Sequence, residues 1–511
     1  MRLKLINNFY LQLLLLFVLF SAIHYSFGYI FRPIYVFSII CVILFINKKS
    51  VIYKPFIIFY SIFSAIYFPI GIIYGSPSFN IFTSLMYTNY DEAKGFISNI
   101  PYYYYACSLF ILALGYIALK IKIKKQIRYK PVFLIFALVT IIHSPLRTLV
   151  KDGEFNVAHS GLPEIKFIKD VSISISDSIK EHQRMERFLS EKDTFSPSIT
   201  HHDYDTFVLI IGESARRDFM AAYGFPIQNT PFLSESNGIL FNKFISAASS
   251  TQLSLTHTIA SYPQLANNIV SLANKTNFHT YWISNQGAVG VEDTPIASIG
   301  RKAQQSFFIK KTDSADDEYI SDADLLPFIN SAINDSYSKK LIIVHLIGSH
   351  PPACARTNNH YDTFYQNVRL SCYIQGIKET DKLLSNIRTK LIESNSKWSM
   401  MYFSDHGLSY TNRSKPKKLD LAHNSKYKQN FEVPLFITYY DSKHREYITE
   451  QRSALNFMSL FSTWIGISEP KIDNSCNMIS NEPCKNQDRV LNFNNEIINY
   501  SGLQNDPHII F

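Results

Sequence analysis

Acidic and imidazole side chains follow three short apolar runs in the C-terminal two-thirds of the chain. Glu213 comes after the first run, His350 after the second, and Asp405 with His406 after the third. Carboxylate oxygens and imidazole nitrogens are suitable ligands for zinc, which takes about four donors in most protein sites. One such residue alone is typical of a structural or solvated group. Three positions that converge in the fold would indicate a metal-assisted active site.

A group of hydroxyl residues offers a further donor or a nucleophile. Ser249, Ser250 and Thr251 precede an expected short helix at residues 253–261. A hydroxyl at a helix start lies among free backbone N–H groups, which are a natural seat for a phosphate. The same residue types are also the usual helix N-caps. Spacing alone favours the cap interpretation.

The elements that must position these residues follow an α/β pattern from residue 206 onward. The apolar runs at 207–211, 341–344 and 400–403 are typical of buried parallel strands, and helical patterns such as 365–387 separate them. This alternation predicts an open, mostly parallel sheet. Ligands of such sheets bind beyond the carboxyl ends of the strands. The three sets of polar residues are therefore expected at one edge.

The N-terminal third has a different character. The 511-residue chain is 47% hydrophobic and 18% charged, which excludes a disordered protein. Crossing a bilayer takes ~20 apolar residues. A signal peptide at the first apolar run is disfavoured, because further runs follow and no clear cleavage site is present. The fifth run is short, so four spans are an alternative to five. The runs are at residues 9–28, 31–47, 56–75, 102–119 and 131–144.

Basic residues give an orientation for these spans. Eleven Lys and Arg residues lie before the first run, between the second and third, and between the fourth and fifth. The loops on the other side carry only Arg32 and Lys94. The positive-inside rule therefore places the N-terminus in the cytoplasm and the soluble half outside. Because the basic loops explain much of the +9 net charge, no nucleic-acid partner is expected.

We thus expect three parts along the chain. Residues 1–145 form an α-helical membrane domain of about five helices, and residues 206–511 form an α/β catalytic domain. Residues 146–205 connect them. Apolar and charged residues alternate near 173–191, which fits an interfacial helix. A plain linker fits the connector equally well.

Four cysteines lie in the soluble half, in a compartment that permits disulfides. Four cysteines allow three pairings, and we favour the pairing of sequence neighbours, Cys354–Cys372 and Cys476–Cys484. Free thiols are the alternative. A cysteine zinc site is disfavoured because no C-x-x-C spacing is present.

Four motifs in order, behind five apolar runs, give the chain a family resemblance. It resembles the bacterial lipopolysaccharide phosphoethanolamine transferases, which belong to the sulfatase/alkaline phosphatase-like superfamily. Those enzymes have a five-span membrane anchor and a periplasmic catalytic domain, so the resemblance covers nearly the whole chain. The matching residues are Gly212-Glu213-Ser214, Thr251-x-x-Ser254, Gly348-Ser349-His350, Ser404-Asp405-His406-Gly407 and a later His423.

The resemblance implies roles for these residues. Thr251 would be the nucleophile, and His350 and His423 would contact phosphoryl oxygens or shuttle protons. A surface histidine is the alternative for His423. The implied ligands of a catalytic Zn2+ are Glu213, Thr251, Asp405 and His406.

It also implies substrate contacts. The loop after the third run resembles the lipid-headgroup segment of the family, with Ser84 in place of an Asn and with Glu92 retained. A solvated loop acid is the alternative for Glu92. Asn285 is a third expected contact. It lies in the segment 282–286, which is more similar to the branch that modifies core sugars than to the lipid A branch.

The implied activity is a transfer of phosphoethanolamine from phosphatidylethanolamine, through a threonine intermediate, to lipopolysaccharide at a core sugar or lipid A. We expect a monomer in the cell inner membrane, in contact with its lipids, with a periplasmic catalytic domain and a role in cationic peptide resistance. A phosphoglycerol transferase of the same superfamily and a non-catalytic envelope lipid-binding protein are the alternatives. A sulfatase is disfavoured, because Thr251 cannot supply the formylglycine that those enzymes derive from Cys or Ser.

Overall fold

A computed structural model describes the chain at residues 8–78, 81–82, 100–123, 130–152, 160–201, 203–290, 293–311, 319–411 and 416–509. Internal contacts divide it into two compact units, residues 1–180 and 181–511. The division falls within one continuous helix, α8 (Pro163–Ser190). The predicted boundaries of the connector stay a prediction.

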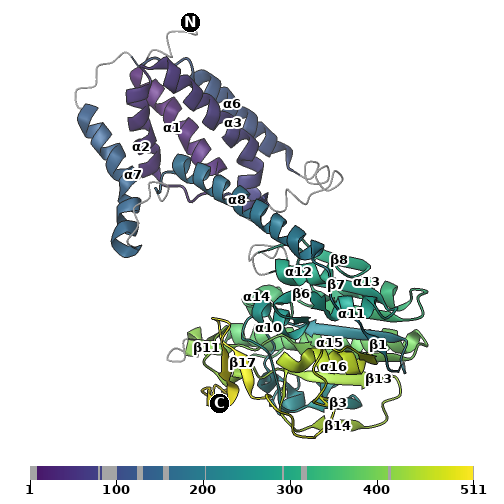
Figure 1. The fold of residues 1–511 in the computed structure, drawn as a ribbon. Helices are drawn as coiled ribbons and strands as arrows, with labels where there is room; N and C mark the ends of the chain where they lie inside the picture. Colours follow the sequence, from purple (N-terminus) through teal and green to yellow (C-terminus); the bar gives the residue numbers. More distant parts are fainter. Residues whose placement is uncertain are drawn as a thin grey trace. The chain divides into compact units, whose positions relative to one another are not determined.

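Apolar helices make up the first unit (Figure 1). Among the described residues, three helical stretches are long and apolar enough to cross a membrane: Phe9–Ser26, Ser50–Ile72 and Pro131–Val150. The other two apolar helices are shorter, so the count of five spans stays a prediction. The full helices are α1 (Phe9–Ser26), α2 (Pro33–Ile46), α3 (Ser50–Tyr74), α6 (Tyr102–Ala118) and α7 (Lys130–Asp152).

A buried hydrogen bond between two ionisable side chains joins the first turn of α8 to α1. His24 Nε2 lies 2.8 Å from Glu164 Oε1, and both side chains are 2% exposed. The Tyr60 hydroxyl of α3 donates to the Glu164 carbonyl at 3.3 Å. Ionisable groups within apolar bundles are costly unless they pair with one another. The pair therefore fixes the first turn of α8 against α1.

An eight-stranded sheet forms the centre of the second unit, and only β13 runs against the others. The strands β10, β2 and β9 are adjacent and parallel, in register from Trp398, Thr206 and Lys340. The expected mostly parallel sheet is confirmed. In spatial order its strands are β14 (Arg445–Ile448), β3 (Gly238–Phe241), β13 (Leu435–Tyr439), β10 (Trp398–Ser404), β2 (Thr206–Gly212), β9 (Lys340–His345), β7 (His279–Gly287) and β8 (Gln305–Lys310).

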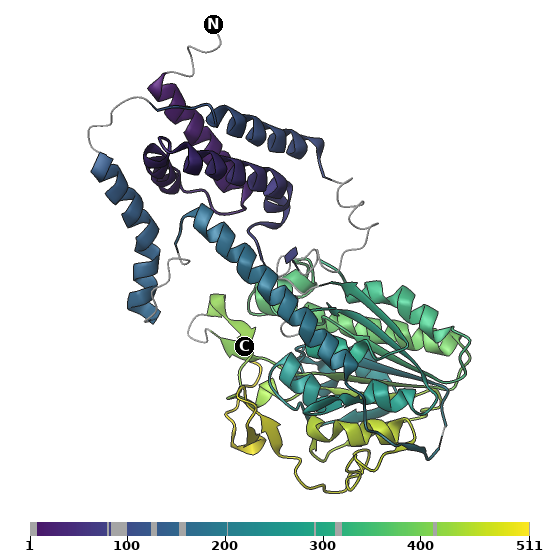
Figure 2. The ribbon, with the colours of Figure 1, turned by 45° about the horizontal axis from the view of Figure 1, so that its top comes forward.

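Helices cover both faces of this sheet (Figure 2). Successive strand residues point to opposite faces. In β2, Leu209 packs with one group of helices and Ile210 with the other. Burial on both faces explains why these strands are continuous apolar runs. The first group of helices is α10 (Thr251–Thr258), α11 (Ile269–Asn274), α12 (Thr294–Gly300) and α16 (Phe457–Trp464), and the second is α9 (Pro231–Glu235), α13 (Leu326–Ile333) and α15 (Val368–Glu393).

Short elements complete the second unit around the sheet. One of them is the antiparallel pair of β11 and β12, and the candidate site residue His423 directly follows β12. The short helix is α14 (Ala353–Arg356), and the paired short strands are β1 (Ser198–Ile199) with β16 (Ile467–Ser468), β4 (Phe244–Ile245) with β15 (Arg452–Ser453), β5 (Ala260–Ser261) with β6 (Gln264–Asn268), β11 (Ser409–Thr411) with β12 (Asp420–Ala422), and β17 (Arg489–Leu491) with β18 (Ile497–Asn499).

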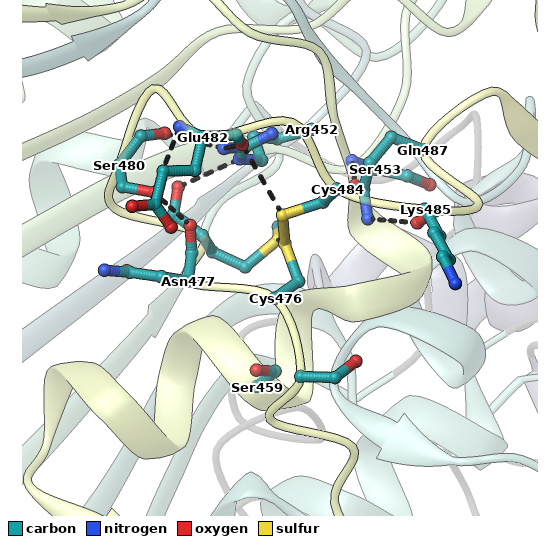
Figure 3. Close-up of a disulfide and its surroundings, with 12 residues drawn as sticks. Arg452, Ser453, Ser459, Cys476, Asn477, Ser480, Glu482, Cys484, Lys485 and Gln487 are labelled. Atoms are coloured by element: carbon teal, nitrogen blue, oxygen red, sulfur yellow. Dashed lines mark hydrogen bonds between the residues drawn. A yellow bond between two sulfur atoms is a disulfide. The ribbon is translucent and has the colours of Figure 1, made fainter.

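Two disulfides close loops of the second unit, Cys354–Cys372 and Cys476–Cys484, which is the pairing that the sequence favours. Figure 3 shows Arg452 beside the second bridge. The Arg452 guanidinium is buried and donates to the carbonyls of Ser480 and Glu482 at 2.6 and 2.7 Å. The disulfide thus closes the loop whose carbonyls satisfy a buried cation.

A second buried arginine braces the strand ends that carry the polar motifs. Arg216 follows β2 and makes a two-pronged contact with Asp218, at 2.9 and 2.7 Å. It also donates to the carbonyl of Leu408, after β10, and to that of Asp506 near the C-terminus. Burial alone would raise the pKa of Asp218, but the Arg216 cation holds it well below its usual range. Two strand ends and the C-terminal segment therefore share one cation.

Replacing Arg216 is expected to destabilise the fold strongly. Arg216→Met leaves the fully buried Asp506 carboxylate without its cation, which costs about 3–5 kcal/mol of unfolding free energy. The control is Arg369→Met, which breaks an exposed ion pair with Asp420 and should cost about 0–1 kcal/mol. Denaturant unfolding of both full-length variants measures the difference. Equal losses would show that Arg216 does not brace the strand ends.

Candidate active site

The sheet brings the sequence-predicted residues to one edge. Glu213 follows β2, Asp405 and His406 follow the adjacent β10, and His350 follows β9. His423 comes directly after β12. Ligand atoms of Glu213, His406 and His423 all lie within 4.8 Å of one another.

The Thr251 hydroxyl lies between two of these groups. Its Oγ1 is 3.1 Å from Glu213 Oε2 and 3.1 Å from His406 Nε2. Thr251 is the first residue of α10, and Ser250 at the N-cap makes no side-chain cap hydrogen bond. The Thr251 side chain therefore faces the acidic cluster rather than its own helix. Free N–H groups of the first turn would favour a phosphate here.

The tautomer of His406 follows from its neighbours. Nδ1 lies 2.8 Å from the Gly407 carbonyl, which can only accept, so Nδ1 carries the hydrogen. The lone pair of Nε2 then points at Thr251 Oγ1 and lies 3.2 Å from Asp405 Oδ2. Burial lowers the pKa of His406, which favours this neutral form. A neutral imidazole whose Nδ1–H is held by a backbone carbonyl is prepared to bind a metal through Nε2.

Two buried carboxylates give the cluster its charge. Glu213 and Asp405 are each 1% exposed. Burial and the nearby Asp405 raise the pKa of Glu213, and burial raises that of Asp405. Asp405 Oδ2 has no hydrogen-bond donor within the described ranges. A divalent cation would remove this imbalance, so the donor set of Glu213, Thr251, Asp405 and His406 fits a metal ion.

The spacing of Thr251 and Ser254 has a structural reason. Ser254, one turn after Thr251, donates through Oγ to the Asp405 carbonyl at 2.6 Å. This bond ties α10 to the end of β10. Ser214, which follows Glu213, has a φ of 58° and donates from its hydroxyl to Glu213 Oε1 at 2.6 Å. A left-handed non-glycine residue is uncommon and clusters at functional sites.

The loop after β9 holds His350 beside the cluster. Gly348 has a φ of +47°, and a Cβ there would lie 2.9 Å from the Glu213 carbonyl oxygen, so only glycine fits. Arg356 donates to the His350 carbonyl at 3.3 Å, and its Nη2 lies 3.4 Å from His350 Nδ1. Because a guanidinium only donates, Nδ1 accepts and Nε2 carries the hydrogen. His350 therefore offers an N–H to a substrate oxygen.

His423 completes a row of three imidazoles. Its ring centre lies 4.7 Å from that of His406 and 6.3 Å from that of His350. Burial, and then the two neighbouring histidines, lower the pKa of His423 to about 3. It is a neutral imidazole at neutral pH, which can accept a proton. The structure places it in the site rather than on the open surface.

The sequence missed two residues that hold this edge. Gln286 in β7 donates through Nε2 to Glu213 Oε2 at 3.3 Å and to the Leu346 carbonyl at 2.9 Å. Asp322 is buried and accepts from the backbone N–H groups of Ile347 and Gly348, at 2.9 and 2.8 Å. It thereby fixes the loop that carries His350. No spacing signal marks either residue.

Of the three expected substrate contacts, Asn285 is described by the structure. Asn285 is buried, and its Nδ2 donates to the Ile320 carbonyl and to Asp322 Oδ1 at 2.9 Å. Its substrate role stays a prediction. Ser84 and Glu92 lie outside the described residues.

Comparisons with known proteins identify the family of the chain. Residues 205–467 match the sulfatase family model. The chain is 37% identical over 455 residues to the phosphoethanolamine transferase OpgE of Escherichia coli K12, covering 87% of this chain and 86% of that protein. The chain belongs to the phosphoethanolamine transferase family. It is an enzyme of this family, with the sulfatase-like fold that the sequence predicted.

Further similarity extends to other members. The chain is 25% identical to the phosphoethanolamine transferase EptC of Escherichia coli K12, over 66% of this chain and 65% of that protein. The crystal structure of the C-terminal periplasmic domain of EptC from Escherichia coli, in complex with zinc, matches the fold with a TM-score of 0.54. The two are 20% identical, over 60% of this chain and 96% of that domain.

We expect Asp322 to control catalysis through the position of the His350 loop. In Asp322→Asn, an amide N–H₂ group replaces one acceptor that faces a backbone N–H, so the loop should shift. Transferase turnover should fall by roughly tenfold or more, with the melting temperature and metal content retained. Asp324→Asn is the control, since among the described residues Asp324 accepts from the Ser321 N–H alone, at the exposed start of the 3-10 turn. Equal turnover in the two variants would contradict a positioning role.

Metal binding is expected to depend on the buried acids. Glu213→Gln removes one anionic donor, so the purified full-length protein should lose most of its bound divalent metal. Asp381→Asn changes a buried carboxylate that accepts from the Phe232 and Leu233 N–H groups elsewhere in the unit, and should keep the metal. Metal analysis by inductively coupled plasma mass spectrometry compares them. Full metal retention in Glu213→Gln would exclude this donor set.

Proposed function

We propose that this chain transfers phosphoethanolamine from phosphatidylethanolamine, through a phosphoethanolaminyl-Thr251 intermediate, to lipopolysaccharide. The observation that carries the proposal is the Thr251 hydroxyl, 3.1 Å from both Glu213 and His406 at the start of α10. A nucleophile held between an acidic group and an imidazole matches an activated hydroxyl. Membership of the phosphoethanolamine transferase family indicates that phosphoethanolamine is the group transferred.

Zn2+ is the proposed cofactor. Two carboxylates, an imidazole and a hydroxyl are donors that zinc accepts. The EptC domain of similar fold was crystallised in complex with zinc. When bound by Glu213, Thr251, Asp405 and His406, zinc would lower the pKa of the Thr251 hydroxyl and offset charge on the phosphoryl oxygens.

In the first step, Thr251 Oγ attacks the phosphorus of phosphatidylethanolamine. A bond from Oγ to phosphorus forms, and the bond from phosphorus to the diacylglycerol oxygen breaks. A ring nitrogen of neutral His423 takes the threonine proton and passes it to the leaving oxygen. His350 donates a hydrogen bond from its Nε2–H to a phosphoryl oxygen, where negative charge develops.

In the second step, an acceptor hydroxyl or phosphate of lipopolysaccharide attacks the same phosphorus. The bond from Thr251 Oγ to phosphorus breaks, and the phosphoethanolamine moves to the acceptor. His423 takes the acceptor proton and returns it to the threonine oxygen. Both half-reactions thus use one proton carrier and leave the enzyme unchanged.

Placement in the inner membrane, with the second unit in the periplasm, is part of the proposal. The apolar helices and the basic loops of the first unit support a multi-pass anchor. The two disulfides of the second unit support an oxidising compartment. The donor lipid and the growing acceptor would share this membrane. A monomer suffices, since every proposed site residue comes from one chain. A cationic group on the acceptor would lower negative surface charge and weaken cationic peptide binding.

Intact-protein mass spectrometry tests the intermediate. After incubation with phosphatidylethanolamine, we expect a mass gain of ~123 Da on the full-length protein. Thr251→Ala should lose the gain, while Thr256→Ala on the same helix should keep it, because Thr256 bonds only within its helix and to His257.

Other outcomes point to the alternatives. A phosphoglycerol adduct after incubation with phosphatidylglycerol would favour the phosphoglycerol transferase. Absence of any adduct and of lipid turnover, with metal bound, would favour the non-catalytic lipid-binding protein. An adduct that persists in Thr251→Ala would place the nucleophile elsewhere.

A further inference from the structure

We propose that a polar groove along α15 binds the oligosaccharide part of the acceptor, an inference that rests on the proposed transfer to lipopolysaccharide. The groove has a volume of about 1160 Å³ and is bounded by α9, by the 3-10 turn at Asp322–Leu325 and by α15. This volume is larger than that of ordinary small-molecule pockets. All of its lining residues belong to the second unit.

One end of the groove adjoins the active site. Gly348 and Arg356 line it there. Gly348 packs on the backbone of Glu213, and Arg356 contacts His350 through its carbonyl and Nδ1. A ligand at this end therefore lies next to the loop that presents His350 to the phosphoryl group.

From this end the groove follows α15. The helix lines it from Gln375 to Arg388, a rise of ~20 Å at 1.5 Å per residue. Because α15 connects β9 to β10, which run in the same direction, the helix leads back from the active-site edge where β9 ends to the edge where β10 begins. Gln375 is therefore nearer to the active-site edge than Arg388 is. A groove of this length suits an extended chain of several sugars, with one end at the reacting phosphorus.

The lining has the chemistry of a sugar site. Asn237, Gln375, Thr380 and Asn386 offer amide and hydroxyl groups, which both donate and accept hydrogen bonds as sugar hydroxyls do. Tyr319 adds a partly exposed ring. Asn237, Gln375 and Thr380 already bond within the protein and have capacity for a further bond, whereas the Asn386 amide has no partner among the described residues. An acyl chain would cover this largely polar lining without hydrogen-bonding to it, which is costly. The groove therefore favours the carbohydrate part of the acceptor over its lipid part.

The groove carries charged groups of both signs, with carboxylates such as Glu235 and Glu379 beside its lysines and arginines, which suits the hydroxyls of sugars as donors and acceptors. Lys382 and Asn386 make no side-chain hydrogen bond or ion pair with any residue that the structure describes. Arg388 has a buried Nε without a hydrogen-bond partner in the same part of the chain. Lys382 and Asn386 are one turn apart and therefore share one side of α15, where they are placed to bind one extended polar ligand.

Binding of core oligosaccharide tests the groove. The probe is lipopolysaccharide core oligosaccharide freed from lipid A by mild acid, titrated by calorimetry into full-length Thr251→Ala so that no turnover occurs. Adding Lys382→Ala with Asn386→Ala should weaken binding by about tenfold, the loss of two hydrogen bonds. The matched control is Lys390→Ala, an exposed lysine of α15 paired with Glu393 outside the groove. It should leave the affinity unchanged.

The outcomes separate the groove from the proposed function. Unchanged affinity in the double variant, or equal loss in Lys390→Ala, overturns the groove. A loss accompanied by a lower melting temperature assigns the residues a structural role and also overturns it. Binding of lipid A without sugars that the same double variant weakens equally would overturn the sugar assignment. If the Thr251 adduct fails to form but the double variant still weakens oligosaccharide binding, the transfer mechanism fails and the groove stands.

Discussion

Two carboxylates buried against each other, Glu213 and Asp405, set the constraint on which the catalytic edge depends. Burial opposes ionisation of both, repulsion from Asp405 further raises the pKa of Glu213, and Asp405 Oδ2 finds no donor in the described chain. Such a pair destabilises a fold unless a cation completes it. The neighbouring Thr251 hydroxyl and His406 Nε2 are placed to share that cation. The site is thus a strained arrangement that a bound metal would relieve.

Parallel strand ends explain how residues so distant in sequence meet. Adjacent β2, β10 and β9 end at one edge, so each needs only a short turn to present its polar residue. The turns are then held from outside. Arg216 joins the ends of β2 and β10, Ser254 ties α10 to Asp405, and Asp322 fixes the loop after β9. Rigid supports of this kind keep catalytic groups within the narrow tolerance that transfer requires.

The sequence predicted the sheet and the edge because both follow from local signals. Apolar runs mark β2, β9 and β10, and the residue after each run must lie at the sheet edge. The supports escaped prediction for the opposite reason. Asp322 and Gln286 act through contacts with loops far along the chain, and no local signal marks either as a support, although Gln286 lies in the segment 282–286 that the sequence singled out. Thr251 is an intermediate case. Its spacing correctly predicts a helix start, but the spacing alone favours an N-cap role, whereas the side chain contacts Glu213.

The two outer histidines divide the proposed chemistry between them. Arg356 Nη2 donates toward His350 Nδ1, so Nδ1 is the acceptor and Nε2 is left to donate a hydrogen bond to the substrate. His423 lies beside His406 and His350, with a carboxylate oxygen of Glu213 within 4.8 Å, and burial is the main reason that its pKa is low and its ring neutral. In the proposed mechanism it takes a proton in one half-reaction and releases it in the same step, because burial disfavours its charged form. A short-lived imidazolium suits a ping-pong enzyme, because the proton must leave before the second acceptor arrives.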